Sequence, residues 1–250
     1  MNAFASEIVA STFILFCRIG ACLMLAPGFS SPRLPMRARL FIALALTLAL
    51  APALTGGKPI VIANLAVLAG DIMSELFIGG MIGLLGRLYF LSLETMMMAA
   101  SMNIGMSNAM GAPIDENQPM PAISTLVTLT ATCLIFVSDL HWELIRGIVA
   151  SYSIMPVGFA LSPRVALMSV ADGLASTFVL ALRIASPFLV FSIVVNFAIG
   201  LVNRLTPQIP VFFISGPLVI GLGLGLFYFI SGPMVSVFIS QFADWAVKGN

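Results

Sequence analysis

Charged residues, cysteine and histidine are all scarce in this 250-residue sequence. Only 8% of the residues are Asp, Glu, Lys or Arg, against roughly a quarter in soluble domains. The net charge is +1 and the cations form no block, so we expect no nucleic-acid-binding surface. One histidine and three cysteines without a CxxC pair argue against a disulfide framework, a metal site or another cofactor. The cysteines are expected to be buried, inert thiols.

The same shortage of reactive groups argues against a membrane enzyme. Hydrolysis needs an activated nucleophile beside a base, or a metal ion with clustered ligands. His141 stands between Asp139 and Glu143, but neighbouring positions of a helix point in different directions. We therefore expect no catalytic residue, and we interpret His141 as a residue at a loop edge that caps helices.

Apolar residues dominate the sequence and make up 60% of it. Backbone polar groups in an apolar medium must bond within their own segment, and the alternation typical of strands is missing, so the apolar runs predict helices. The expected fold is all-α, an integral membrane-type protein with about six long hydrophobic helices. Some helices should be broken, because Gly216-Pro217 and Gly232-Pro233 interrupt the last run. The apolar runs lie near residues 8–27, 40–54, 65–93, 122–138, 144–161, 165–202 and 211–243.

Several charged residues lie inside these apolar runs, where each needs a partner or water. Asp71 and Glu75 are one helical turn apart and repel each other, which predicts a nearby cation or a wet interior, with a proton-relay pair as the less favoured alternative. Asp172 and Arg183 share a helix face but are about 16 Å apart along it. We expect other helices or neighbouring subunits to complete such sites. The buried and inter-subunit charges are Arg18, Asp71, Glu75, Arg87, Asp172 and Arg183.

Small residues at helical spacing predict two places of close helix packing. Gly79, Gly83 and Gly86 form one strip, and Gly221 with Gly225 forms a second. In both places a bulky side chain would separate the packed backbones, so these glycines are interpreted as packing residues.

Methionines recur at every fourth residue from Met98 to Met110, just before a segment rich in Gly and Pro. Flexible thioethers suit a surface that adapts to changing partners, although an ordinary packing stripe is the alternative. The Gly and Pro content prevents a regular helix, and a non-helical segment between apolar helices usually lines a cavity. We predict a pore plug or gasket that includes Met102, Gly105, Met106, Met110, Gly111, Pro113 and Met120.

Short motifs are spread along nearly the whole chain in a characteristic order. They include Phe16-Cys17-Arg18-Ile19-Gly20-Ala21 and Pro35-Met36-Arg37-Ala38-Arg39, then Asp139-Leu140-His141 and Pro156-Val157-Gly158, then Ala185-Ser186-Pro187-Phe188 and Pro207-Gln208-Ile209-Pro210. Each motif is weak by itself. Together, their order and spacing resemble the FliR/SctT family of type III export-gate subunits.

This resemblance implies a core subunit of the flagellar protein export gate, at the basal body in the bacterial inner membrane. Its implied partners are the P, Q and B components (FliP, FliQ and FlhB), membrane lipid, and unfolded flagellar proteins in transit. One copy would join a hetero-oligomeric helical cone. Within a single 1–250 unit, residues 1–169 would form a P-component-like portion with a plug loop at 105–121, and residues 170–250 a Q-component-like hairpin. The equivalent injectisome subunit is the alternative, and a secondary transporter is less favoured.

Overall fold

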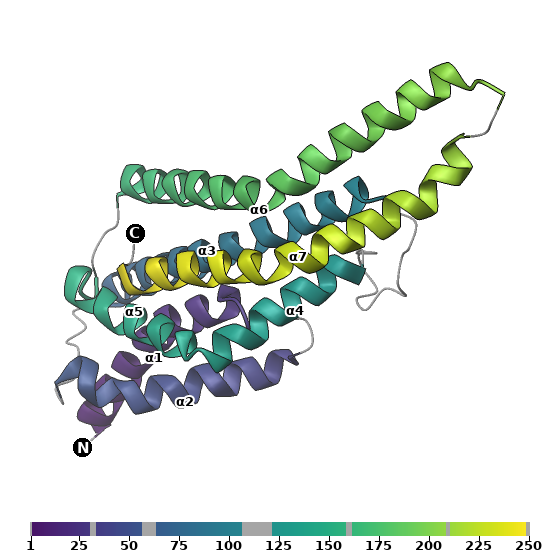
Figure 1. The fold of residues 1–250 in the computed structure, drawn as a ribbon. Coiled ribbons are helices and arrows are strands. Elements are labelled where there is room, and N and C mark those ends of the chain that lie inside the picture. Colours follow the sequence, from purple (N-terminus) through teal and green to yellow (C-terminus); the bar gives the residue numbers. More distant parts are fainter. Residues whose placement is uncertain are drawn as a thin grey trace. The chain divides into compact units, whose positions relative to one another are not determined.

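The computed structural model describes residues 2–30, 34–56, 64–106, 122–158, 162–208 and 211–248. These residues form seven α-helices and no β-strand, which confirms the all-α prediction (Figure 1). In chain order the helices are α1 (Asn2–Leu25), α2 (Met36–Thr55), α3 (Leu65–Asn103), α4 (Ala122–Val137), α5 (Leu140–Ile154), α6 (Pro163–Leu205) and α7 (Val211–Lys248).

Five of the described helices, α1, α2, α3, α6 and α7, are long and apolar enough to cross a membrane. A sixth candidate span is the pair α4 and α5, which is bent by 70° at the break between the two helices. Asp139 lies in this break with φ 57°, a left-handed conformation that aspartate tolerates better than most residues. The described chain is therefore an all-helical membrane protein with five or six candidate spans.

Several helices differ from their sequence predictions, and two of the differences have a clear physical reason. The second apolar run was predicted at residues 40–54, but α2 begins at Met36 because Arg37 and Arg39 continue the helix, as good helix formers do. The predicted breaks at Pro217 and Pro233 are wrong, since α7 remains helical through both. A proline removes one backbone hydrogen bond, whereas a full break would leave several polar groups unpaired in an apolar medium.

The chain divides into two compact units, each built from separate segments. Unit 1 comprises Met1–Tyr89, Ile135–Ala175 and Ala243–Asn250, and unit 2 comprises Phe90–Leu134 and Ser176–Phe242. The portions 1–169 and 170–250 were predicted from a family resemblance and not from compactness. That division stays a prediction.

The core of unit 1 brings together α1, α2 and α5. Ile19, Cys22 and Leu23 of α1 pack with Ala43 of α2 and Ile148 of α5, and all of them are buried. Partly buried side chains surround this cluster, namely Phe16, Phe29, Leu46, Leu50, Leu54, Ile82 and Tyr152. Burial of these apolar groups is the main favourable contribution to packing in this unit.

The core of unit 2 contains aromatic contacts between α3 and α7. The ring of Phe90 meets those of Phe238 and Phe242 edge-on, at centroid distances of 5.4 and 6.0 Å. Edge-on contact is a preferred geometry for aromatic pairs and adds to the stabilisation from buried area.

The three cysteines differ in exposure. Cys17 and Cys22 of unit 1 are buried, whereas Cys133 of unit 2 is exposed. The expectation that all three cysteines are buried is therefore wrong.

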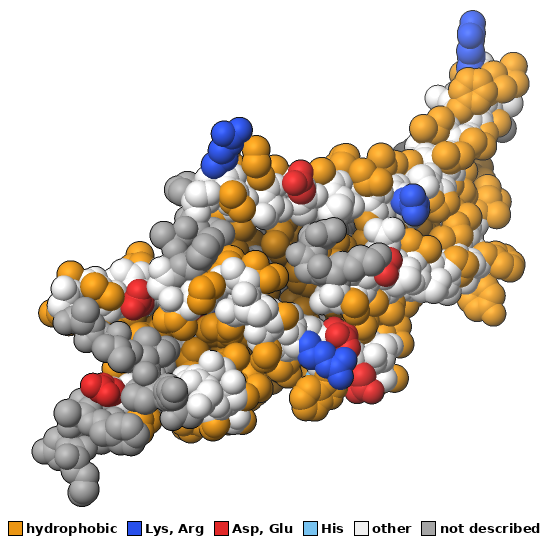
Figure 2. All heavy atoms as spheres, turned by 90° about the vertical axis from the view of Figure 1, so that its left-hand side faces the viewer, with side chains coloured by type: hydrophobic (Ala, Val, Ile, Leu, Met, Phe, Trp, Pro, Cys, Tyr) orange, Lys and Arg blue, Asp and Glu red, His pale blue; other side chains and the backbone are white. Residues whose placement is uncertain are grey.

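Large hydrophobic side chains also lie on the outside of the described helices. Figure 2 shows hydrophobic groups over much of the face in view, with charged groups in a few small, scattered spots. Phe41, Phe197 and Phe229 each expose more than two thirds of their surface. Surfaces of this kind are typical of contact with lipid or with other subunits.

Candidate functional site

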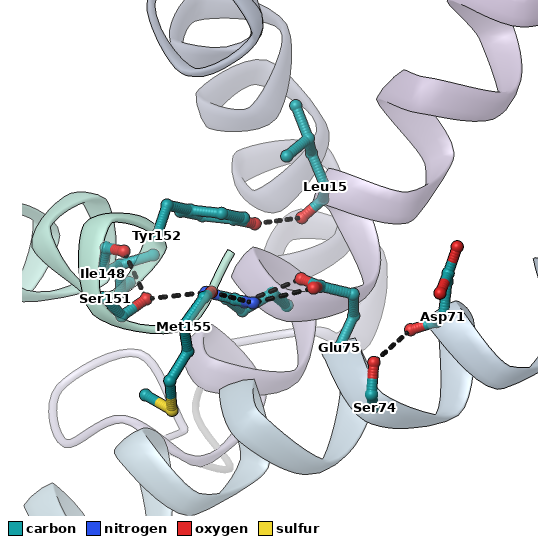
Figure 3. Close-up of polar contacts among 9 residues, drawn as sticks. Leu15, Asp71, Ser74, Glu75, Ile148, Ser151, Tyr152 and Met155 are labelled. Atoms are coloured by element: carbon teal, nitrogen blue, oxygen red, sulfur yellow. Dashed lines mark hydrogen bonds and ion pairs between the residues drawn. The ribbon is translucent and has the colours of Figure 1, made fainter. Parts of the chain in front are cut away.

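Arg18 of α1 forms a fully buried ion pair with Glu75 of α3. Its Nε donates to Oε2 of Glu75 and its Nη2 donates to Oε1, each at 2.7 Å (Figure 3). This two-point geometry is the strong form of an arginine–carboxylate contact. The cation predicted near Asp71 and Glu75 is therefore Arg18, which stands 57 residues earlier in the sequence.

The Arg18 side chain also contacts the end of α5. Nη1 donates to Oγ of Ser151 at 3.1 Å, and Nη2 donates to the carbonyl oxygen of Met155 at 2.9 Å. The guanidinium carbon lies 3.9 Å from the centre of the Tyr152 ring, a cation–π contact. Arg18 thus finds its partners within its own chain, which differs from the expectation that neighbouring subunits complete its surroundings. We call Arg18, Glu75, Ser151, Tyr152 and Met155 the Arg18 cluster.

Asp71 lies one turn before Glu75 but outside the ion pair. Glu75 accepts both bonds from Arg18, whereas the contact drawn for Asp71 in Figure 3 is the bond that its backbone carbonyl accepts from Ser74. Asp71 instead faces the segment after α5, where a methyl group at Gly158 would lie 3.0 Å from its Oδ1. Gly158 has φ +79°, so both the backbone conformation and this close approach favour glycine. The two carboxylates have different surroundings, which counts against a proton-relay pair.

The other predicted charges have no such surroundings in the part of the chain that the structure describes. Arg87 is half-buried on α3, whereas Asp172 and Arg183 are exposed on α6. No ion pair among the described residues includes any of the three. Their expected partners on other subunits stay a prediction.

The first glycine strip lies where α3 meets α1. A methyl group at Gly83 would lie 2.5 Å from the carbonyl oxygen of Cys22, and one at Gly79 would overlap the backbone of Arg18. At Gly86 it would lie 3.1 Å from both Pro27 and Trp245. The two helices therefore approach each other at backbone distance in the turns of α3 that follow Glu75 of the buried ion pair.

The second glycine pair, Gly221 and Gly225, is not in a packing contact. A side chain at Gly221 or Gly225 would have no atom within 4 Å, so these residues do not pack against the rest of the described chain. Gly223, which the spacing argument passed over, is the buried one: a methyl group there would lie 2.5 Å from Cβ of Ile104 on the segment after α3. Spacing of four residues indicates a shared helix face but does not reveal which face is covered.

The methionine stripe reaches the surface where α3 ends. Met102 exposes 51% of its surface, Met106 is half-buried, and the neighbouring Met97 is fully buried. The helix ends at Asn103, and Gly105 follows with φ +77°, a conformation that glycine adopts readily. The other predicted plug residues, Met110, Gly111, Pro113 and Met120, lie outside the described residues.

No group of three or more His, Cys, Asp or Glu side chains in the described ranges is placed to hold a metal ion. His141 packs its ring near Phe136 and Trp142, at centroid distances of 5.4 and 5.6 Å. Its Nδ1 is buried and makes no hydrogen bond to another described residue. In the structure His141 therefore packs against aromatic rings, and its Nδ1 does not make the expected capping bond.

The sequence of this chain is similar to those of known bacterial proteins. The sequence matches the model for bacterial export proteins, family 1, over residues 9–245. It is 35% identical to the flagellar biosynthetic protein FliR of Caulobacter vibrioides, over 90% of each chain. The proteins of the same name from Aquifex aeolicus and Escherichia coli K12 are 28% and 25% identical, over 95% and 84% of this chain and 91% and 79% of theirs. The matched residues include the Arg18 cluster, the first glycine strip and the methionine stripe.

Proposed function

Because the chain belongs to family 1 of the bacterial export proteins, we propose that it forms and seals part of the channel of the flagellar type III export gate. It is a membrane protein of the flagellar export apparatus. Within that apparatus we assign it to the gate itself, through which unfolded flagellar proteins pass. The flagellar system is favoured over an injectisome because the matched relatives carry flagellar names.

The surface of α6 is the observation that carries this proposal. Asp172 and Arg183 are exposed on this helix among large exposed apolar residues, such as Phe178 and Leu182. A charge surrounded by apolar side chains is costly unless an opposite charge or a polar group meets it. Neighbouring gate subunits would supply such groups and cover the apolar surface as well.

We assign FliP and FliQ as the neighbours in the assembled cone, with FlhB joining them and one copy of this chain in each gate. Residues 1–169 would take the place of a P component and residues 170–250 that of a Q component, in the bacterial inner membrane at the basal body. The role is a passive one, because guiding and sealing a channel requires shape and apolar contact. It invokes no catalytic residue and no cofactor.

The sealing part of the proposal concerns the end of α3. The exposed thioether of Met102 and the glycine turn at Gly105 lead into residues 107–121. A flexible thioether can follow a changing surface without leaving rigid gaps, which suits a gasket around polypeptide in transit. We assign the plug to Met102, Gly105 and Met106 together with Met110, Gly111, Pro113 and Met120.

Co-purification with FliP and FliQ tests the place of the chain in the gate. We expect Arg183→Ala and Asp172→Asn to reduce the recovered complex at least about tenfold, because each would leave an opposite charge unpaired in a covered surface at a cost of about 2–5 kcal/mol. Arg204→Ala is the matched control, since Arg204 is exposed in the last turn of the same helix. Normal complex yield and normal motility of both variants would show that the α6 charges meet no other subunit.

A further inference from the structure

Helix α2 has one face that packs into unit 1. Ala43, Leu46, Thr47, Leu50 and Leu54 recur at the spacing of one helix face. Ala43 and Thr47 are fully buried, and the three leucines pack against the core cluster of α1, α2 and α5. This face therefore fixes how α2 is rotated about its own axis.

The opposite face of α2 is apolar and exposed. Phe41 exposes 71% of its surface and Leu48 exposes 56%, with Leu40 and Leu44 also exposed. A surface helix of a protein in water carries polar side chains on this side. The one polar side chain between Leu40 and Leu54 is Thr47, and it is turned inward, where its hydroxyl donates to the carbonyl oxygen of Ala43 at 2.7 Å. Four helical turns thus present only hydrocarbon outward.

The length of α2 and the position of its charges match a bilayer. Its 20 residues rise about 30 Å, and the uncharged stretch from Leu40 to Thr55 rises about 24 Å, which approaches the roughly 30 Å of the hydrocarbon layer. Both of its charged residues, Arg37 and Arg39, lie in the first turn, and Arg37 is exposed. In contrast, α3 and α6 have 39 and 43 residues and carry charged residues in their middle parts. Of these three helices, α2 alone can face acyl chains from its second turn to its end without burying a charge.

We propose that the outward face of α2, formed by Leu40, Phe41, Leu44 and Leu48, contacts phospholipid acyl chains in the assembled gate. The guanidinium of Arg37 lies at the end of this face and binds the phosphate of an anionic headgroup. Arginine suits this position because its long apolar stem can follow the helix while its charge reaches the interface. Ala45, Ala49 and Ala53 lie on the same outer side, and a helix of another subunit against them is the competing outcome.

Spin labels attached to single cysteines distinguish lipid from protein and from water. Phe41→Cys, Leu44→Cys, Leu48→Cys and Ala49→Cys would be labelled in assembled gates in native membranes, with the exposed Cys133 replaced by serine. We expect all four labels to collide readily with oxygen, which dissolves in acyl chains, and poorly with a water-soluble nickel chelate. Leu50→Cys, on the packed face, is the control and should be poorly accessible to both. Low accessibility to both reagents at the four outer positions, or high accessibility to nickel, would overturn the proposal.

A second experiment tests the proposed contact between Arg37 and an anionic lipid headgroup. Gates with Arg37→Gln or Arg37→Lys would be reconstituted in phosphatidylglycerol or in phosphatidylcholine, and the phosphatidylglycerol retained on purification would be measured by mass spectrometry. We expect Arg37→Gln to lose roughly fivefold in retention and Arg37→Lys to keep it, as the loss of one cationic contact requires. Equal retention in all three proteins would refute the headgroup contact. Co-purification with FliP and FliQ, measured on the same samples, reports on the proposed function separately.

Discussion

Arg18 is costly to bury but well satisfied where it lies. Removing a guanidinium and a carboxylate from water is unfavourable, and their mutual attraction offsets this only when the geometry is good and further hydrogen bonds are made. Both conditions hold, because Glu75 accepts two bonds and Ser151 and Met155 accept the others. The cluster joins α1, α3 and the end of α5, so it should contribute specificity to this arrangement of helices.

Substitutions in the ion pair test this role. Arg18→Met and Glu75→Gln should each cost about 3–5 kcal/mol, because each leaves its former partner buried without an opposite charge. The double substitution Arg18→Met/Glu75→Gln should cost clearly less than the sum of the two single substitutions. The matched control is Arg146→Met, whose pair with Glu143 is exposed and should contribute less than about 1 kcal/mol. The measurement is the thermal denaturation midpoint of the purified gate.

The same variants separate a structural role from a proton-carrying one. If Glu75→Gln leaves the denaturation midpoint and complex yield unchanged but abolishes export, the carboxyl group acts in proton transfer and the structural interpretation is wrong. The sequence predicted either a cation or a wet interior near Glu75, and the structure shows the cation. The sequence did not identify Arg18 as that cation, because the two residues are 57 positions apart and meet only through tertiary packing.

Helices α1 and α3 meet through glycine. At Gly83 even a methyl group would lie 2.5 Å from a backbone oxygen of α1, and backbone cannot move aside as a flexible side chain can. The strip therefore sets the distance between the two helices, and with it the geometry that allows Arg18 to reach Glu75. Packing and electrostatics are coupled in this pair of helices.

Gly83→Ala tests this coupling. We expect it to destabilise the gate by about 1–3 kcal/mol, the usual cost of overpacking. Gly70→Ala on the same helix is the control: its side chain would meet no atom within 4 Å, and alanine stabilises a helix by about 1 kcal/mol relative to glycine. Denaturation midpoints of the two gates should shift in opposite directions. A shift of equal size and sign in both would mean that the strip is not a packing contact.

The helices also show what sequence patterns can and cannot predict. The apolar runs predicted the positions of the long helices, because backbone polar groups in an apolar medium require helical bonding. They did not predict that α7 continues through Pro217 and Pro233, since a proline weakens a helix locally and the surroundings decide whether it breaks. Periodicity likewise selected Gly221 and Gly225, although the covered face contains Gly223, because period alone does not reveal which face meets another helix.

The chain as a whole has more apolar surface than it can cover alone. Exposed Phe, Leu and Val residues lie along α2, α6 and α7 in the described parts of the chain. Two kinds of neighbour would account for them, lipid along α2 and other gate subunits along α6. The function could be predicted from the resemblance over nearly the whole chain, because motifs that are weak one by one become specific through their order. The proposed plug is the part of that function that depends most on residues 107–121.

Ion conductance of the membrane is the measurement that tests the sealing role most directly. It would be recorded in cells that express gates shortened between Ser107 and Asn117, or gates with Met102→Ala and Met106→Ala. We predict normal complex levels with increased leakage of ions in the shortened gate and a smaller increase in the methionine variant, because the seal is removed in one and loosened in the other. Met73→Ala, at an exposed methionine outside the stripe, should leave conductance unchanged. Normal complex levels without extra leakage in the shortened gate would contradict the sealing role and leave the stripe as ordinary packing.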